Sequence, residues 1–266
     1  MILVLGIGFV GLTTALGFAE KGHSVLGFDI DKSKTAELSS GKTALYEPGL
    51  AEALRRHLGV RFNMLSKLPD TADDIQAIFI CVETPCKDNG QADLRYVFDA
   101  LDMLEPMLKS DSFGGILVIK STVPPSTAKT KIIPYLRAKG ISVPVANNPE
   151  FLREGLGWDD FINPDRIVCG SEDPISAEIL KAIYKDFNAP IIFTSLNTAE
   201  FIKYLSNTML ASMISFSNEM CMIAQTIGDI SVKQAFEILH MDKRWADASM
   251  KQYVYPGCGF GRFFGR

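Results

Sequence analysis

The feature that most constrains the fold is the glycine-rich stretch VLGIGFVGL near the start of the chain. Gly6, Gly8 and Gly11 follow a run of apolar residues and open a helical pattern, in the spacing G-x-G-x-x-G. Glycines at these positions permit a tight turn, close approach of a diphosphate and close packing of the helix on the strand. The pattern therefore predicts a strand–turn–helix unit with a dinucleotide at the helix N-terminus, where Phe9 and Val10 lie.

Asp29 supports this interpretation, because it directly follows the second predicted strand, Ser24–Phe28. A carboxylate there can bind the ribose 2′-hydroxyl of the dinucleotide and repels a 2′-phosphate. The sequence therefore predicts NAD, in preference to NADP, as the cofactor. Asp31 is a near neighbour and could share the role of Asp29.

Short apolar runs and longer helical patterns alternate through the first two thirds of the chain. The predicted strands are Ile2–Leu5, Ser24–Phe28, Ala77–Val82, Ile116–Ile119, Val143–Ala146, Arg166–Cys169 and Ile191–Thr194. Helical patterns include Phe9–Lys21, Asp93–Leu108, Ser126–Lys139 and Pro174–Phe187. This alternation predicts an α/β, Rossmann-like fold with a mostly parallel, doubly wound sheet covered on both faces.

The pattern changes after Thr194. Residues 197–227 contain neither proline nor glycine and are rich in apolar side chains, which predicts one long helix, followed by a shorter one over Ser231–Leu239. We therefore expect an NAD-binding domain over residues 1–195 and an all-helical segment over residues 196–266. Because little of this chain remains to pack on the long helix, we expect a homodimer through residues 197–227.

Composition excludes several other classes of function. The 27 basic and 31 acidic residues give a net charge of −4 without a basic block, which argues against a nucleic-acid partner. No apolar run reaches the roughly 18 residues that span a membrane. The apolar start lacks the basic region of a signal peptide, so a cytoplasmic location is expected. Five scattered cysteines show no metal-ligand spacing, so no metal is expected.

Threonines follow two of the predicted strands. Thr122 lies in VIKSTVPPST, two residues before Pro124, and Thr84 lies in CVETP, directly before Pro85. Ligands of such sheets bind at the carboxyl ends of the strands, which favours both threonines as cofactor contacts. The alternative is that each hydroxyl caps its own loop.

Two carboxylates, Glu150 and Glu154, lie four residues apart in NNPEFLREG. If this segment is helical, both lie on one face. Paired carboxylates suit general acid–base chemistry because their mutual repulsion can raise one pKa. The alternative is a helix N-terminus that carries acidic residues for structural reasons.

The long helix carries polar residues on an otherwise apolar stripe. Glu200, Lys203 and Asn207 share one face of AEFIKYLSNTML. A lysine and an amide in such surroundings can stabilise an oxyanion or bind a phosphate. The alternative is a lysine that extends to solvent and pairs with Glu200.

Together and in this order, these segments resemble the UDP-glucose/GDP-mannose 6-dehydrogenase family of nucleotide-sugar dehydrogenases. The matching stretches are GIGFVGL, FDID, YEPGL, TP…GQADLRYV, KSTVPPST, NNPEFLREG, DFINPDRIV, EFIKYLSNT and YPGCGFG, which run from residue 1 to about residue 261. The resemblance implies oxidation of a sugar C6 alcohol to a carboxylate in two NAD-dependent steps, through a cysteine thiohemiacetal and thioester. UDP-glucose is the expected substrate and UDP-glucuronate the product, with GDP-mannose and UDP-N-acetylhexosamines left open.

The resemblance also implies roles for individual residues. Thr122 and Glu154 would position and activate the hydrolytic water, Glu150 would serve acid–base steps, and Lys203 and Asn207 would stabilise an oxyanion. The implied cofactor contacts are Gly6, Gly8, Phe9, Val10, Gly11, Asp29, Thr84, Thr122 and Glu154. The implied substrate contacts are Phe151, Leu152, Arg153, Lys203, Asn207, Tyr255, Gly259, Phe260 and Gly261.

The last residues depart from the family pattern. The family loop continues as G-F-G-G-x-C-x-P-K-D, whereas here GFG is followed by RFFGR, which puts Phe264 at the position of the nucleophilic cysteine. Cys258 lies six residues upstream. We therefore expect a truncated, frameshifted or replaced terminus without the C-terminal nucleotide-binding domain, and an inactive or impaired enzyme. The alternative is a non-catalytic NAD-binding dimerisation module. The NPEFLREG and YPGCGFG stretches disfavour a 2-hydroxyacid or 6-phosphogluconate-type dehydrogenase.

Overall fold

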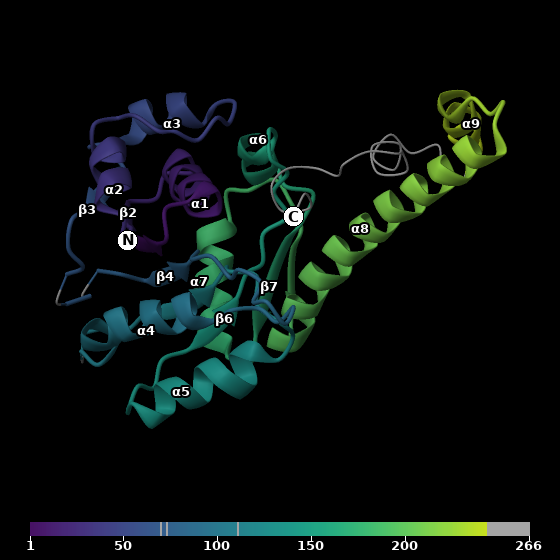
Figure 1. Ribbon diagram of the computed structural model, residues 1–266. Helices are drawn as coiled ribbons and strands as arrows, with labels where there is room; N and C mark the ends of the chain where they lie inside the picture. Colours follow the sequence, from purple (N-terminus) through teal and green to yellow (C-terminus); the bar gives the residue numbers. More distant parts are fainter. Residues whose placement is uncertain (70, 73, 111, 244–266) are drawn as a thin grey trace. The chain divides into compact units, whose positions relative to one another are not determined.

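The computed structural model describes residues 1–69, 71–72, 74–110 and 112–243 (Figure 1). It forms two compact units, of which the first is Met1–Lys203 and the second begins at Tyr204. The long helix α8, Leu196–Ile227, starts in the first unit and continues in the second. The domain boundary expected near residue 195 stays a prediction.

The first unit is built on one eight-stranded sheet in the order β3-β2-β1-β4-β5-β6-β7-β8. The strands are β1 Ile2–Leu5, β2 Val25–Phe28, β3 Phe62–Leu65, β4 Ala77–Ile80, β5 Ile116–Ile119, β6 Val145–Asn147, β7 Ile167–Ser171 and β8 Ile191–Thr194. All neighbouring strands are parallel except β6 and β7. The first six strands have the 3-2-1-4-5-6 order of dinucleotide-binding folds, which confirms the predicted Rossmann-like sheet.

The central strands are apolar throughout because helices cover both faces of the sheet. The sequences of β1, β4 and β5 are ILVL, AIFI and ILVI, and every residue in them is buried. Strands buried on both faces have continuous apolar runs rather than alternating ones. Edge strand β3, with the sequence FNML and an exposed Asn63, lacks such a run, and it is absent from the predicted strands for that reason.

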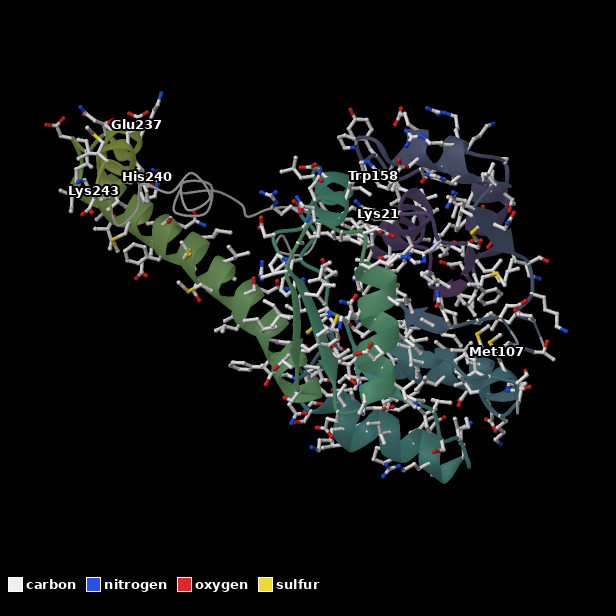
Figure 2. The ribbon with its side chains drawn as sticks, turned by 180° about the vertical axis from the view of Figure 1, so that it is seen from behind. Lys21, Met107, Trp158, Glu237, His240 and Lys243 are labelled. Atoms are coloured by element: carbon white, nitrogen blue, oxygen red, sulfur yellow. The ribbon has the colours of Figure 1, made fainter. Side chains whose placement is uncertain are left out.

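Successive strand residues pack into two separate cores. Ile2 and Val4 of β1 contribute to one core, and Leu3 and Leu5 contribute to the other. The first core is covered by α1 Phe9–Glu20, α3 Leu50–His57, α6 Gly157–Ile162 and α7 Pro174–Tyr184, with α2 Lys32–Ser39 at its edge. The second core is covered by α4 Arg95–Leu108 and α5 Ile133–Ala138. Figure 2 labels one residue of each layer, Trp158 on α6 and Met107 on α4.

The predicted helix Ser126–Lys139 forms in two parts. A π-helical turn, η1, spans Ala128–Ile132 and leads directly into α5. Pro134 lies in the first turn of α5 and has no N–H to donate to the preceding turn, so the regular hydrogen-bond pattern cannot continue through it. Ser126, which precedes η1, has a positive φ of 72°.

Two helices make up the described part of the second unit. Helix α8 ends before Gly228, whose φ is +78°, and α9 spans Val232–Leu239. The Ser231 hydroxyl caps α9 by accepting a hydrogen bond from the Gln234 N–H at 3.4 Å. These bounds agree with the helices predicted over residues 197–227 and 231–239. Among the described residues, no helix is both long and apolar enough to cross a membrane.

Candidate functional site

The turn between β1 and α1 has two glycines that packing requires and one that it does not. Gly6 has a φ of +84°, and a Cβ on it would lie 2.9 Å from the backbone of Cys81 and Val82. A Cβ on Gly11 would lie 1.8 Å from the Gly6 carbonyl oxygen. Gly8 differs, because a Cβ there would meet no atom within 4 Å. The space over Gly8 is therefore open to a ligand.

The N-terminus of α1 opens onto this space. Its first intrahelical hydrogen bond runs from the Leu12 N–H to the Gly8 carbonyl, at 2.8 Å. The earlier N–H groups, on Phe9, Val10 and Gly11, have no acceptor within the helix. Exposed N–H groups and the positive end of the helix dipole together suit a diphosphate.

Asp29 lies at the end of β2, beside the glycine turn. Its Oδ2 accepts hydrogen bonds from the Ile7 N–H at 2.8 Å and from Lys34 Nζ at 2.9 Å. The Asp29 side chain is only 7% exposed. Asp31, which could have shared the role of Asp29, instead caps α2, because its Oδ1 accepts from the N–H groups of Ser33 and Lys34. Lys34 thereby places a positive charge beside Asp29.

The loops after β4 and β5 are joined at the carboxyl edge of the sheet. The Thr84 hydroxyl donates to the Thr122 carbonyl at 2.7 Å, and the Ser121 hydroxyl donates to the Val82 carbonyl at 2.7 Å. The Thr84 hydroxyl thus holds the neighbouring loop rather than capping its own. Within the described ranges the half-buried Thr122 hydroxyl forms no hydrogen bond, so it is available to a ligand.

A buried ion pair joins the loop after β6 to the start of α8. Lys203 Nζ lies 2.6 Å from Glu150 Oε1, and these side chains are 8% and 13% exposed. The other carboxylate oxygen, Oε2, accepts from the Leu152 N–H at 2.6 Å. Lys203 Nζ also lies 5.6 Å from the centroid of the Phe151 ring. Lys203 thus pairs with Glu150 rather than with Glu200, the partner considered from the sequence.

The segment between Glu150 and Leu156 is a loop, and α6 begins only at Gly157. The condition under which Glu150 and Glu154 would share a helix face is therefore not met. The loop is held from two sides. Arg153 pairs with Asp160, with Nη2 and Oδ1 2.6 Å apart, and Glu47 Oε2 accepts from the Gly155 N–H at 2.9 Å. Glu47, which is not among the predicted site residues, is buried and belongs to the YEPGL stretch.

Glu200 is a second buried carboxyl at the start of α8 and is only 2% exposed. Its Oε1 accepts from the Ala128 N–H at 2.8 Å and from Asn147 Nδ2 at 3.5 Å. Its Oε2 is buried and has no hydrogen-bond partner. Burial raises the pKa of this carboxyl. Glu200 therefore attaches α8 to the η1 turn that follows the Thr122 loop.

Lys120 lies at the end of β5 and is 4% exposed. Its Nζ donates to Asn148 Oδ1 at 3.0 Å, and the Tyr184 hydroxyl donates to the same oxygen at 2.6 Å. Burial lowers the pKa of Lys120. The sequence signal for this network is the lysine that directly follows an apolar strand in VIKST, a stretch in which Thr122 was the predicted site residue.

The buried cysteines are unsuited to nucleophilic chemistry. Burial raises the thiol pKa of both Cys81 and Cys169 to about 12, so both stay protonated near neutral pH. Cys258 and Phe264 lie outside the described residues, as do Tyr255, Gly259, Phe260 and Gly261. Asn207 lies one helical turn beyond Lys203 on α8, in the second unit.

The chain matches two consecutive domains of one protein family. Residues 1–188 match the NAD-binding domain of the UDP-glucose/GDP-mannose dehydrogenase family, and residues 197–263 match its central domain. A UDP-glucose 6-dehydrogenase of Rickettsia felis is 39% identical over 264 residues, which are 98% of this chain and 57% of that protein.

Solved structures are similar over the same region. A UDP-glucose dehydrogenase from Pyrobaculum islandicum has a TM-score of 0.90 and 39% identity, covering 98% of this chain and 60% of that one. A GDP-mannose dehydrogenase from Pseudomonas aeruginosa has a TM-score of 0.84 and 31% identity, covering 91% of this chain and 56% of that one. The chain thus spans less than two thirds of the length of these relatives. Because its glycine turn, its sheet order and both matched domains agree, the chain belongs to the UDP-glucose/GDP-mannose dehydrogenase family.

Proposed function

We propose that this chain supplies the NAD site and part of the sugar site of a nucleotide-sugar 6-dehydrogenase that converts UDP-glucose to UDP-glucuronate. The observation that carries the proposal is the buried Glu150–Lys203 pair at the end of β6, in the same sheet whose β1–α1 turn leaves open space over Gly8. Both features lie at carboxyl ends of strands, where ligands of such sheets bind. The named activities of the relatives support this choice of substrate.

The residues present suit NAD. The N-terminus of α1 would hold the diphosphate, and Asp29, with Lys34 beside it, would bind the adenosine ribose. Thr84 and Thr122 would line the space at the ends of β4 and β5. When bound, NAD supplies an acceptor for the hydride that leaves C6 of the sugar.

The ion pair suits an alcohol oxidation. A carboxylate beside a lysine can accept a hydroxyl proton, while the ammonium stabilises an alkoxide or a tetrahedral oxyanion. We assign these roles to Glu150 and Lys203, with Asn207 assisting at the oxyanion. Thr122, through its free hydroxyl, and Glu154 would orient the water that hydrolyses an acyl intermediate. Phe151, Leu152 and Arg153 would line the sugar site, together with Tyr255 and residues 259–261 of the final loop.

We further propose that the chain as it stands does not complete both oxidations. Phe264 occupies the position of the nucleophilic cysteine, and the buried Cys81 and Cys169 are protonated thiols. A phenyl ring cannot form a thiohemiacetal or thioester. The same observation favours the second candidate function, a non-catalytic NAD-binding module.

Two measurements on the purified protein test these proposals. Calorimetric titration with NAD should show binding, and NADH absorbance after addition of UDP-glucose should show no sustained turnover. Steady formation of two NADH per sugar would refute the proposed impairment. Absence of any NAD binding would refute the cofactor site itself. Calorimetric titration with UDP-glucose, GDP-mannose and UDP-N-acetylglucosamine in parallel decides which of the candidate sugar nucleotides binds.

We also propose that the chain forms a homodimer through α8. The second unit has an apolar cavity of about 510 Å³ between α8 and α9. It is lined by Met209, Ser212, Met213, Phe216, Met220, Ala235, Phe236 and Leu239. Exposed apolar surface of this kind is typical of interfaces between copies of one chain. Sedimentation should give a dimer for the wild type and a monomer for Phe216→Asp, whereas a monomeric wild type would contradict the proposal.

A further inference from the structure

Arg166 directly precedes β7. If β7 were parallel to β6, Arg166 would lie beside the amino end of β6, but the antiparallel direction places it beside the carboxyl end. Strand β7 runs antiparallel to β6, with Ala146 opposite Ser171 and Asn147 opposite Gly170. The amino end of β7 therefore lies beside the carboxyl end of β6. Continuing this register places Arg166 opposite Phe151, and the Arg166 guanidinium carbon lies 4.3 Å from the centroid of that ring.

The charge of Arg166 is not neutralised by a neighbour. Among residues 1–243, leaving out 70, 73 and 111, its one recorded interaction is this ring contact, and it forms no ion pair. Even the adjacent Asp165 is not paired with it. Arg153, on the same loop as Phe151, does pair with a carboxylate, that of Asp160. Lys203 lies over the same ring as Arg166, but its charge is paired with Glu150.

A half-buried, unpaired guanidinium is costly unless an anion completes it. Stacking on a ring uses the face of the guanidinium and leaves the N–H groups at its edge, which can bind two oxygens of one anion. Because the ring in question is Phe151, those N–H groups lie at the proposed sugar site. The alternative is a purely structural role, in which Arg166 only packs against Phe151.

We propose that Arg166 is an oxyanion-binding residue of the sugar-nucleotide site. This inference rests on the proposed function. The anion is either the carboxylate formed at C6 of the sugar or a phosphate of the nucleotide, and in both cases a planar fork of N–H groups meets two oxygens. Glu150 and Lys203 neutralise each other, so Arg166 supplies the positive charge that remains at the end of β6.

Calorimetric titration of wild type, Arg166→Gln and Arg166→Lys with UDP, UDP-glucose and UDP-glucuronate tests the proposal. Loss of a hydrogen-bonded charge pair should weaken binding about tenfold or more in Arg166→Gln. Weakening of UDP-glucuronate alone assigns the carboxylate, and equal weakening of all three ligands assigns a phosphate. Arg166→Lys should recover part of the affinity, because it keeps the charge but not the fork.

A matched control is Arg137→Gln, which removes an exposed arginine from α5, on the other face of the sheet. It should bind all three ligands as the wild type does, and thermal melting should show that every variant is folded. If the wild type binds but Arg166→Gln binds equally well, the inference about Arg166 is wrong and the proposed function stands. If the wild type binds none of the three ligands, the proposed substrate is wrong and this inference is overturned with it.

Discussion

Replacing Gly8 by alanine tests whether the space at the start of α1 is where a diphosphate binds. Gly8 has φ −81° and ψ −160°, which alanine adopts without strain, and the new Cβ would meet no atom within 4 Å. Alanine is a poorer N-cap than glycine, but it also lowers the conformational entropy of the unfolded chain, which stabilises the folded state by about 0.4–1 kcal/mol. We therefore expect the free energy of unfolding to change by less than about 1 kcal/mol, and Tm by no more than about 2–4 °C.

NAD binding should respond much more strongly. In Gly8→Ala the added methyl group occupies the space through which a diphosphate would approach the N–H groups of Phe9 and Val10. Hydrogen bonds to a charged group contribute about 1.5–3 kcal/mol each. Loss of one such bond raises Kd by a factor of about 10–100. Calorimetric titration with NAD measures this change in Kd, and thermal melting followed by circular dichroism measures the change in Tm.

A second glycine provides the matched control, whereas a third is unsuitable for the test. Gly114→Ala is the matched control, since its Cβ also meets no atom within 4 Å but lies just before the amino end of β5, away from the ligand edge. It should bind NAD normally. Gly11→Ala is uninformative about binding, because a Cβ 1.8 Å from the Gly6 oxygen disrupts the turn itself. If Gly8→Ala is folded and binds NAD with the wild-type Kd, no diphosphate passes over Gly8 and the assignment of this turn fails.

Three other perturbations have expected outcomes. Glu150→Gln and Lys203→Met should each cost about 3–5 kcal/mol in urea unfolding by leaving a buried charge unpaired, and the double variant should cost less than their sum; additive losses would contradict the pairing. Because the pKa of Glu200 is raised in the folded state, the contribution of this group to stability is full below the ordinary carboxyl pKa and is lost as pH rises; the difference in unfolding free energy between wild type and Glu200→Gln should therefore vary with pH in this sense, and a difference independent of pH would contradict the assignment. Iodoacetamide should label the exposed Cys86 in the native protein but not Cys81, whose thiol pKa is about 12.

The central part of the fold was predictable because its signals are local. The strand β1, the glycines after it and Asp29 all lie within the first 29 residues, and each pattern depends on the spacing of neighbours along the chain. The long helix was likewise evident from the absence of proline and glycine over residues 197–227. Strand β3 was not predictable, because four residues with a polar one among them do not differ from a loop.

The candidate site was predicted less completely, because its partners are far apart in sequence. Glu150 and Lys203 were both selected, but their pairing spans 53 residues and requires the packed sheet. Spacing along α8 instead suggested Glu200 as the partner of Lys203. Arg166 was read only as part of a strand, since the direction of β7 cannot be inferred from an apolar run.

The first two turns of α8 bind to the α/β unit more closely than the change of composition at residue 195 suggests. Glu200 accepts a hydrogen bond from the Ala128 N–H, and Lys203 forms an ion pair with Glu150. If α8 were separated from the α/β unit, the Glu150 carboxylate and the Ala128 N–H would lose their partners. Buried polar groups without partners are costly. Because Lys203 is also the last residue of the first compact unit, the start of this helix belongs to that unit, and the proposed dimer interface would begin only after it.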